Sequence, residues 1–240
     1  MRIALIGYGK MGRLIEQVAL SRGHVISAII DSSSNVEVIN KEHTDIAIEF
    51  TKPDCAVQNI RTCVEKGIPI VVGTTGWNDD LHQTVSFVHE NQGSLLYASN
   101  FSIGVNVFFE LNKLLAKLMN AHPEYHASVE EIHHVQKRDA PSGTAISIAE
   151  QMINAHEAYT NWQLAESELS ENTLPIQAKR IPEVPGTHSV TYKSNIDSIS
   201  LTHEAFNREG FANGAVIAAE WLNGKHGVFT MQDVLNITKI

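Results

Sequence analysis

The stretch "RIALIGYGKMG", residues 2–12, decides the fold, because an apolar run leads directly into three spaced glycines. The run has the length and apolar character of a strand that is buried on both faces. Gly7, Gly9 and Gly12 follow in the spacing G-x-G-x-x-G, and a helical pattern of apolar residues comes next. A second apolar run then ends in Asp31. The stretch therefore predicts a strand, a glycine turn, a helix and a second strand.

This context is the one in which G-x-G-x-x-G predicts a dinucleotide site rather than a purely structural turn. The first glycine permits the tight turn, the second lets the backbone approach a pyrophosphate, and the third lets helix and strand pack closely. The N–H groups that begin the helix then attract the phosphates, and an acidic residue about 20 positions on binds the ribose. The cofactor-binding residues expected here are Gly7, Tyr8, Gly9, Lys10, Met11, Gly12 and Asp31.

Strands and helices continue to alternate through the first hundred residues, which predicts a doubly wound parallel sheet of the Rossmann type. Only about 14 residues separate the second strand from the third, so no full crossover helix is expected between them. Strands are predicted at 45–50, 68–76 and 94–100, and helices at 54–67 and 78–91. Two turns that follow these strands are expected to flank the nicotinamide: Gly73, Thr74, Thr75 and Ala98, Ser99, Asn100, Phe101. The alternative is that they are ordinary turns without a role in binding.

The second half of the chain is richer in alternating strands, which is typical of a mixed or antiparallel sheet with one exposed face. It predicts an α+β domain over 102–210, between two segments of a dinucleotide-binding domain at 1–101 and 211–240. The polar stretch 158–175 is expected to be a surface loop. The predicted elements are helices at 106–119 and 211–224 and strands at 125–134, 187–193 and 197–203.

Composition excludes several classes of function. The formal charge of −9 argues against a nucleic-acid partner. No apolar run approaches the ~20 residues of a membrane span, and no signal-peptide layout precedes the first strand. Cys55 and Cys63 have no metal-binding or redox spacing, so both are expected to be small buried residues in a reducing compartment. A cytoplasmic protein is expected.

A second informative stretch is "EEIHHVQKRDAPSGTA", residues 130–145. A regular strand cannot bring His133, His134 and Lys137 into one site, but a strand that ends near His133 and then turns can. Ser142 is a good helix N-cap, so the residues after it begin a helix with unpaired N–H groups. Single histidines are more often structural, and no HExxH pattern occurs, so no metal site is expected. An imidazole, an ammonium group and a helix start together indicate an anionic substrate that is reduced beside the cofactor.

These residues, with "GYGKMG", "GTTGW", "ASNFSIGVN" and "FANGAVIAAEWL", resemble the bacterial dihydrodipicolinate reductase family over essentially the whole chain. The resemblance implies reduction of a cyclic imine dicarboxylate with NADH or NADPH in the diaminopimelate route to lysine, with release of water. It also implies a homotetramer joined through the second domain. The roles implied are proton transfer by His133 and Lys137, and binding of the substrate carboxylates by His134, Ser142, Gly143 and Thr144.

The chain departs from the family pattern in two places. Pro182 and Pro185 interrupt a loop that is usually glycine-rich, although Arg180 and His188 match the pattern. Glu204 stands where a basic residue is common. Arg208 matches the family pattern, and it is either a substrate or hinge residue or an ordinary surface arginine. Two other functions stay open on the fingerprint alone: an amino-acid dehydrogenase, such as a homoserine or aspartate dehydrogenase, and a non-catalytic nucleotide sensor. Neither needs the His-His-x-x-Lys run.

Overall fold

The computed structural model describes residues 1–165 and 170–237, and the chain divides into two compact units. The first unit consists of Met1–Ile103 and the segment that starts at Glu209, and the second of Gly104–Arg208. Within the described residues, no helix is both long enough and apolar enough to cross a membrane.

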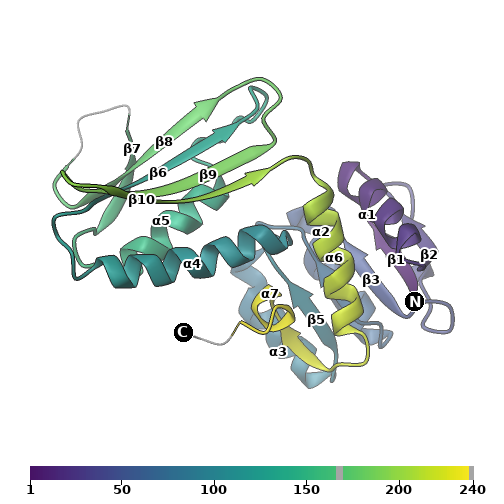
Figure 1. The fold of residues 1–240 in the computed structure, drawn as a ribbon. Coiled ribbons are helices and arrows are strands. Elements are labelled where there is room, and N and C mark those ends of the chain that lie inside the picture. Colours follow the sequence, from purple (N-terminus) through teal and green to yellow (C-terminus); the bar gives the residue numbers. More distant parts are fainter. Residues whose placement is uncertain (166–169, 238–240) are drawn as a thin grey trace. The chain divides into compact units, whose positions relative to one another are not determined.

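The first unit is built on a six-stranded sheet in the order β2-β1-β3-β4-β5-β11, with every neighbouring pair parallel (Figure 1). The predicted parallel sheet is therefore confirmed, and a short sixth strand is added to it. The strands are β1 (Arg2–Ile6), β2 (Val25–Ile30), β3 (Ile46–Glu49), β4 (Ile70–Val72), β5 (Ser94–Tyr97) and β11 (Gly227–Phe229).

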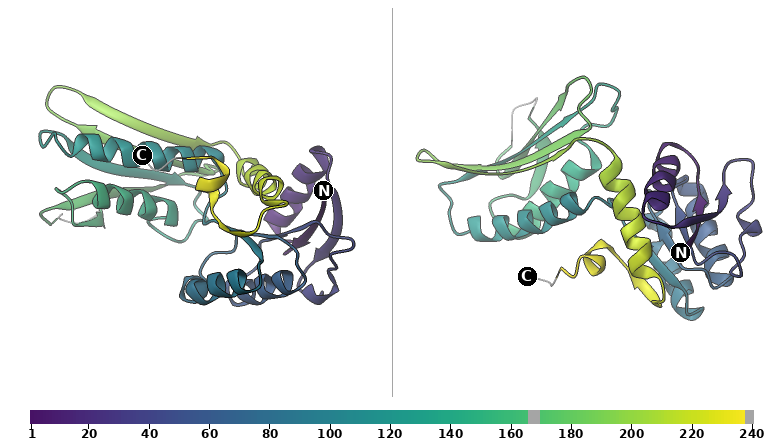
Figure 2. Two further views of the ribbon diagram at one scale, coloured as in Figure 1. Left: turned by 90° about the horizontal axis from the view of Figure 1, so that it is seen from below. Right: turned by 45° about the vertical axis from the view of Figure 1, so that its right-hand side comes forward.

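Helices cover both faces of this sheet, as Figure 2 shows. Successive residues of β1 alternate between two cores: Ile3 and Leu5 pack with α1 and α6, and Ala4 and Ile6 pack with α2 and α3. Only a three-residue 3-10 turn, η1, connects β2 to β3, as their spacing predicted. The helical elements are α1 (Lys10–Ser21), η1 (Val36–Val38), α2 (Pro53–Glu65), η2 (Asn78–Asp80), α3 (Leu81–Glu90), α6 (Glu209–Leu222) and α7 (Met231–Val234).

Two glycines after β1 are required by close backbone approaches. Gly7 has a φ of +95°, and a Cβ there would lie 2.0 Å from the carbonyl oxygen of Phe50. A Cβ on Gly12 would lie 2.2 Å from the carbonyl oxygen of Gly7. The fingerprint therefore holds β1, β3 and α1 in contact, whatever it binds.

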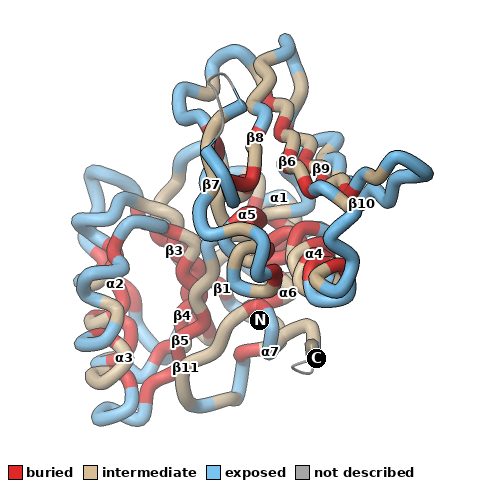
Figure 3. Tube along the Cα trace, turned by 90° about the vertical axis from the view of Figure 1, so that its left-hand side faces the viewer, coloured by how far each residue is buried: buried red, intermediate tan, exposed pale blue. Residues whose placement is uncertain are grey.

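The second unit is a five-stranded mixed sheet in the order β10-β9-β6-β8-β7, and helices α4 and α5 cover one of its faces. The strands β6, β8 and β7 run parallel to one another, whereas β9 is antiparallel to both β6 and β10. Burial alternates along β6 and β9, as expected for a sheet with one covered face (Figure 3). The elements are α4 (Ile103–Met119), β6 (His126–His133), α5 (Gly143–Ala155), β7 (Asn161–Leu164), β8 (Thr173–Arg180), β9 (Gly186–Lys193) and β10 (Ser198–Ala205).

Two predictions were wrong. The stretch 158–175 is not simply a surface loop, because it contains β7 and the start of β8; residues 166–169 lie outside the described residues. Cys63 is buried on α2, but Cys55 is exposed near the start of the same helix. Cys55 and the buried Ala56 are neighbours on α2. Successive residues of a helix point in different directions, so Ala56 enters the core and Cys55 does not.

Candidate active site

The glycine turn provides an open helix N-terminus. Gly9 is the N-cap of α1; it has no side-chain cap, and the first turn contains no acidic residue. A Cβ on Gly9 would meet no atom within 4 Å, so the space in front of the helix start is open. The N–H groups of Lys10 and Met11 begin this helix. Such a terminus attracts phosphate oxygens, so the turn fits the pyrophosphate of a dinucleotide.

A hollow of about 600 Å³ lies at the carboxyl ends of β1, β2 and β3. It is lined by four of the predicted cofactor residues, Gly7, Tyr8, Gly9 and Asp31. Lys10, Met11 and Gly12 lie in the first turn of α1 and do not line it. The lining residues that were not predicted include Ser32, Ser34, Thr51, Lys52 and Cys55.

Asp31 is fixed by its own turn. Its Oδ1 accepts hydrogen bonds from the backbone N–H of Ser33 at 2.9 Å and from the hydroxyls of Ser33 at 2.7 Å and Ser34 at 2.9 Å. These donors, led by the Ser33 hydroxyl, lower the pKa of Asp31. The carboxylate is therefore charged at neutral pH and can accept hydrogen bonds from ribose hydroxyls.

The turn after β4 is hydrogen-bonded to the buried side chain of Glu49. Thr74 is buried, and its hydroxyl donates to Oε1 of Glu49 at 3.0 Å. The same oxygen accepts the backbone N–H of Thr51 at 3.1 Å. Burial raises the pKa of Glu49, although these hydrogen bonds act against the rise. Glu49 escaped sequence reasoning; an acid at the end of an otherwise apolar strand was the available signal.

The other predicted turn residues differ in exposure. A Cβ on Gly73 would lie 2.1 Å from the Phe50 ring, while Thr75 and Ser99 are exposed. Phe101 is 2% exposed and packs against Phe50 with ring centroids 5.8 Å apart. Phe101 is thus a core residue that shapes the turn. Ala98 is half-buried, and Oδ1 of Asn100 accepts the Ser102 backbone N–H at 2.9 Å.

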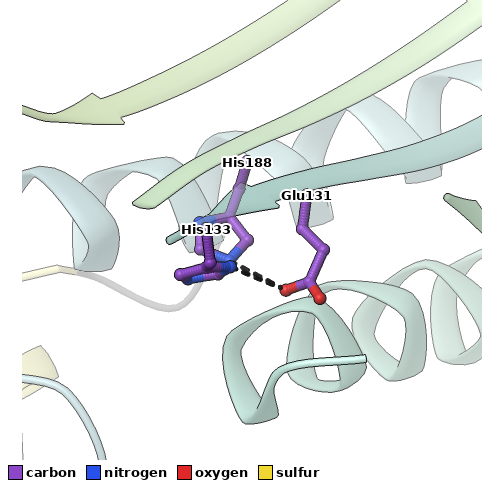
Figure 4. Close-up of side chains that lie close together, drawn as sticks. All are labelled: Glu131, His133 and His188. Atoms are coloured by element: carbon purple, nitrogen blue, oxygen red, sulfur yellow. Dashed lines mark ion pairs between the residues drawn. The ribbon is translucent and has the colours of Figure 1, made fainter. Parts of the chain in front are cut away.

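In the second unit, β6 presents Glu131 and His133 on the face covered by helices (Figure 4). Nδ1 of His133 lies 3.2 Å from Oε2 of Glu131. This is an ion-pair distance, although the ring is not aligned for a regular hydrogen bond. The imidazole of His188, from β9, stands edge-on to that of His133 with ring centroids 5.1 Å apart. Three ionisable side chains therefore meet inside the unit.

Glu131 has no exposed surface, yet it is charged. Burial favours its neutral form, but the interactions with His133, Ser142 and Arg180 outweigh burial and lower its pKa to about 2. The backbone N–H of Ser142 lies 3.1 Å from both carboxylate oxygens, and Nη2 of Arg180 donates to Oε1 at 3.1 Å. Sequence reasoning missed Glu131, although its alternation with Ala127, Val129 and His133 placed a charge on the apolar face of a predicted strand.

His188 is uncharged at neutral pH. Burial lowers its pKa to about 4, and the neighbouring His133 adds to that effect. Its Nε2 lies 3.2 Å from the hydroxyl of Ser142. His188 and Arg180 matched the family pattern, but neither was selected as a site residue.

Arg180 also holds the loop that carries Lys137. Its guanidinium donates to the carbonyl oxygens of Lys137 at 3.3 Å and Asp139 at 2.6 Å. Nζ of Lys137 pairs with Oδ2 of Asp139 at 2.8 Å, and its side chain is 23% exposed. His134 follows the last residue of β6 and lies outside the cluster of Glu131, His133 and His188. β6 ends at His133, which is the condition that sequence analysis gave for bringing His133 and Lys137 towards one site.

The start of α5 is the second open helix terminus. Ser142 is its N-cap, as predicted, and its hydroxyl accepts the N–H of Ala145 at 3.2 Å. The preceding Ala140–Pro141 peptide bond is cis. A Cβ on Gly143 would meet nothing within 4 Å, and Thr144 is half-buried beside it. The free N–H groups of this turn can bind a carboxylate.

The loop between β8 and β9 accommodates its two prolines. Glu183 adopts a φ of +64°, a conformation that usually requires glycine. The N–H of Ile181 still donates to the carbonyl of His133 at 2.8 Å, so the loop supports the end of β6. Glu204 and Arg208 are both exposed.

Ligand atoms of Glu131, His133 and His188 lie within 4.8 Å of one another, a set that can hold a metal ion. The Glu131 carboxylate already accepts hydrogen bonds from a guanidinium and a backbone N–H. The cationic guanidinium repels a second cation at this carboxylate. The donor set therefore favours an internal ion cluster over a metal site.

Comparisons with known proteins show the family of the chain. The family models for the N-terminus and C-terminus of dihydrodipicolinate reductase match residues 1–101 and 104–235. A 4-hydroxy-tetrahydrodipicolinate reductase from Christiangramia forsetii is 49% identical over 98% of both chains. One from Neisseria meningitidis serogroup B is 31% identical over 92% of this chain and 84% of its own. A dipicolinate-bound dihydrodipicolinate reductase from Paenisporosarcina sp. TG-14 shares the fold, with a TM-score of 0.79 at 21% identity over 99% of both chains. The chain therefore belongs to the dihydrodipicolinate reductase family.

Proposed function

We propose that the chain is an oxidoreductase that reduces 4-hydroxy-tetrahydrodipicolinate to tetrahydrodipicolinate with NADH or NADPH, releasing water, in the diaminopimelate route to lysine. Family membership supports the reaction. The observation that carries it for this chain is the end of β6. There, buried His133 and the lysine of the next loop precede an unblocked helix start at Gly143. A proton donor, a cation and a carboxylate site are what such a substrate requires.

In this proposal the nicotinamide supplies a hydride, and residues of the chain supply the remaining chemistry. The 4-hydroxyl group and a neighbouring ring proton leave as water, which gives a ring carbon conjugated with the imine. The hydride then adds to that carbon, and negative charge builds towards the ring nitrogen and the adjacent carbon. The Lys137 ammonium stabilises that charge, and His133 delivers the proton that completes the reduction. His134, Ser142, Gly143 and Thr144 hold the two carboxylates.

The first unit is the proposed cofactor-binding domain. Its support is the open start of α1 and the charged carboxylate of Asp31 at the rim of one hollow. Lys10 lies in the same turn and can approach a 2′-phosphate, so both cofactors are proposed to be used. Backbone and side-chain contacts from the turns at Gly73–Thr75 and Ala98–Phe101 are proposed to border the nicotinamide.

The second unit is the proposed substrate-binding domain and the contact surface of a homotetramer. Its sheet has one face without covering helices in the described residues, where cross-strand hydroxyl pairs such as Ser189–Thr202 and Thr191–Ser200 lie. A cytoplasmic location is also proposed. Two cysteines without disulfide bonds fit a reducing compartment.

The deciding experiment is oxidation of NADH and of NADPH with freshly prepared substrate, followed by absorbance. We expect turnover with both cofactors. His133→Ala and Lys137→Ala should each lower kcat by ~10²-fold or more, the range for loss of a general acid. Cofactor affinity, measured by protein fluorescence, should stay unchanged. The double variant should lose less than the two single losses combined, because both groups act on one transition state.

Two neighbouring residues provide matched controls. His126 lies at the exposed start of the same strand, and Arg138 is an exposed cation next to Lys137. His126→Ala and Arg138→Ala should keep wild-type kcat. Absence of turnover with either cofactor would overturn the proposed reaction, and full activity of His133→Ala would remove that residue from it.

A further inference from the structure

We propose that Glu131 is a positioning residue whose buried carboxylate holds the His133 imidazole with Nδ1 toward the interior, leaving Nε2 to deliver the proton. The inference rests on the proposed function, in which His133 is the proton donor. Glu131 itself touches neither substrate nor cofactor in this proposal and acts through the histidine.

The carboxylate is held from two independent directions. Arg180, from β8, donates to Oε1 at 3.1 Å, and the backbone N–H of Ser142, at the start of α5, lies 3.1 Å from both oxygens. Glu131 itself extends from β6 and has no exposed surface. Residues from β6, β8 and the start of α5 therefore hold the Glu131 carboxylate in place. The His133 imidazole lies beside a carboxylate whose position is fixed.

The ring of His133 is enclosed on its other sides. A Cβ on Gly186 would lie 3.1 Å from its Nε2, so only glycine leaves the ring its present place. The neutral imidazole of His188 stands edge-on to it. Nδ1 of His133 is enclosed beside Glu131, so Nε2 is the ring nitrogen that points away from the carboxylate, and 10% of the side chain is exposed. Proton transfer to a ligand thus has one available nitrogen.

The charge of the carboxylate also matches the proposed step. As an imidazolium, His133 gives the proton on Nε2 to the substrate carbon and becomes a neutral imidazole that keeps its proton on Nδ1. An anion beside Nδ1 stabilises the imidazolium and selects that tautomer afterwards. Other titratable or charged groups that interact with the cluster of Glu131, His133 and His188 are Arg180, Lys137, Asp139 and His203.

The test compares Glu131→Gln with Glu130→Gln. Glutamine preserves the size of the side chain and removes its charge. Glu130 is the adjacent acid on the opposite face of β6, where it pairs with Lys179, so its variant is the matched control. We expect Glu131→Gln to lower kcat at least ~10-fold. The alkaline limb of its pH–rate profile should move about one pH unit lower, because the imidazolium loses its anion. Cofactor affinity should stay unchanged, and Glu130→Gln should behave as wild type.

A second measurement depends neither on catalysis nor on a variant of Glu131. Nitrogen-15 NMR of histidine-labelled wild-type protein, with the His133 signal assigned by its loss in His133→Gln, reports the tautomer at high pH. We expect the Nδ1–H form. The Nε2–H form, or an unmoved alkaline limb in Glu131→Gln, would overturn the positioning role. Full activity of His133→Ala would instead overturn the proposed function, so the two failures can be told apart.

Discussion

Among single residues, Asp31 is the one proposed to bind the cofactor ribose. Oδ1 already accepts three hydrogen bonds from Ser33 and Ser34, so Oδ2 is the oxygen left for a ribose hydroxyl. The hydroxyls of Ser33 and Ser34 both donate to this carboxylate. In the proposed cofactor site, we expect this arrangement to favour NADH over NADPH.

Lys10 is the only residue of the glycine turn that can offset this preference, and Lys10→Ala measures its effect. An exposed charge contact contributes only ~1 kcal/mol, so we expect kcat/KM for NADH and NADPH to differ by no more than about 30-fold, or ~2 kcal/mol. The variant should lose more activity with NADPH than with NADH. Equal losses would mean that Lys10 meets only the shared pyrophosphate or solvent.

Thr144 tests the carboxylate site. Its hydroxyl stands in the first turn of α5, beside Gly143, whose missing side chain leaves open space. Thr144→Val keeps the shape and removes the hydroxyl. We expect weaker competitive inhibition by pyridine-2,6-dicarboxylate and a higher KM, with kcat nearly unchanged. Unchanged inhibition would exclude Thr144 from substrate binding.

Sequence reasoning located the histidines and the helix start but not what holds them. His133 and Ser142 belong to one short run, so their types and spacing were visible. Arg180 and His188 lie on other strands, and only the register of β6 with β8 and β9 brings them to Glu131. Contacts between strands far apart in sequence cannot be deduced from local periodicity.

At the scale of elements, prediction worked where strands are apolar and flanked by glycine, as in the first sheet. It failed for β7 and β8. The four residues of β7 include no long apolar run, and Pro175 lies within β8, where proline argues against an interior strand. Both strands are stabilised by their neighbours in the sheet rather than by their own sequence.

Helix α6 depends on one glycine. A Cβ on Gly214 would lie 1.7 Å from the carbonyl oxygen of Phe101, in the turn that follows β5. Alanine gains about 1 kcal/mol of helix propensity, but this overlap forces the backbone apart at a typical cost of 1–3 kcal/mol or more. We expect Gly214→Ala to lower Tm by several degrees in thermal unfolding.

Gly210→Ala is the control on the same helix. Its Cβ would lie 3.7 Å from Oγ of Ser102, an ordinary contact, and the position is exposed. This variant should keep or slightly raise Tm. An equal Tm for both variants would show that the turn at Phe101 can move away from α6.

For the molecule as a whole, the buried cluster in the second unit sets the response to acid. His188 has a pKa of about 4 in the folded chain against 6.5 when unperturbed. As pH falls through this window, the unfolded chain binds a proton that the folded chain does not, so the free energy of unfolding decreases. Glu131 extends the decrease, because its pKa falls from 4.5 to about 2 on folding. Its contribution is present above pH 4.5 and is lost as pH falls toward 2.

The two groups therefore predict a loss of stability that begins near pH 6.5 and continues to about pH 2, with each group contributing on the order of 3 kcal/mol. Burial also lowers the pKa of His156 and His203, so both add to the loss of stability as pH falls below 6.5. Urea unfolding at a series of pH values measures the slope. His188→Gln should be less stable than wild type at pH 7, yet lose less stability between pH 6.5 and 4, because glutamine binds no proton.

His126→Gln, at an exposed position, should follow the wild-type curve. Parallel curves for wild type and His188→Gln would mean that His188 takes up its proton equally well in the folded chain.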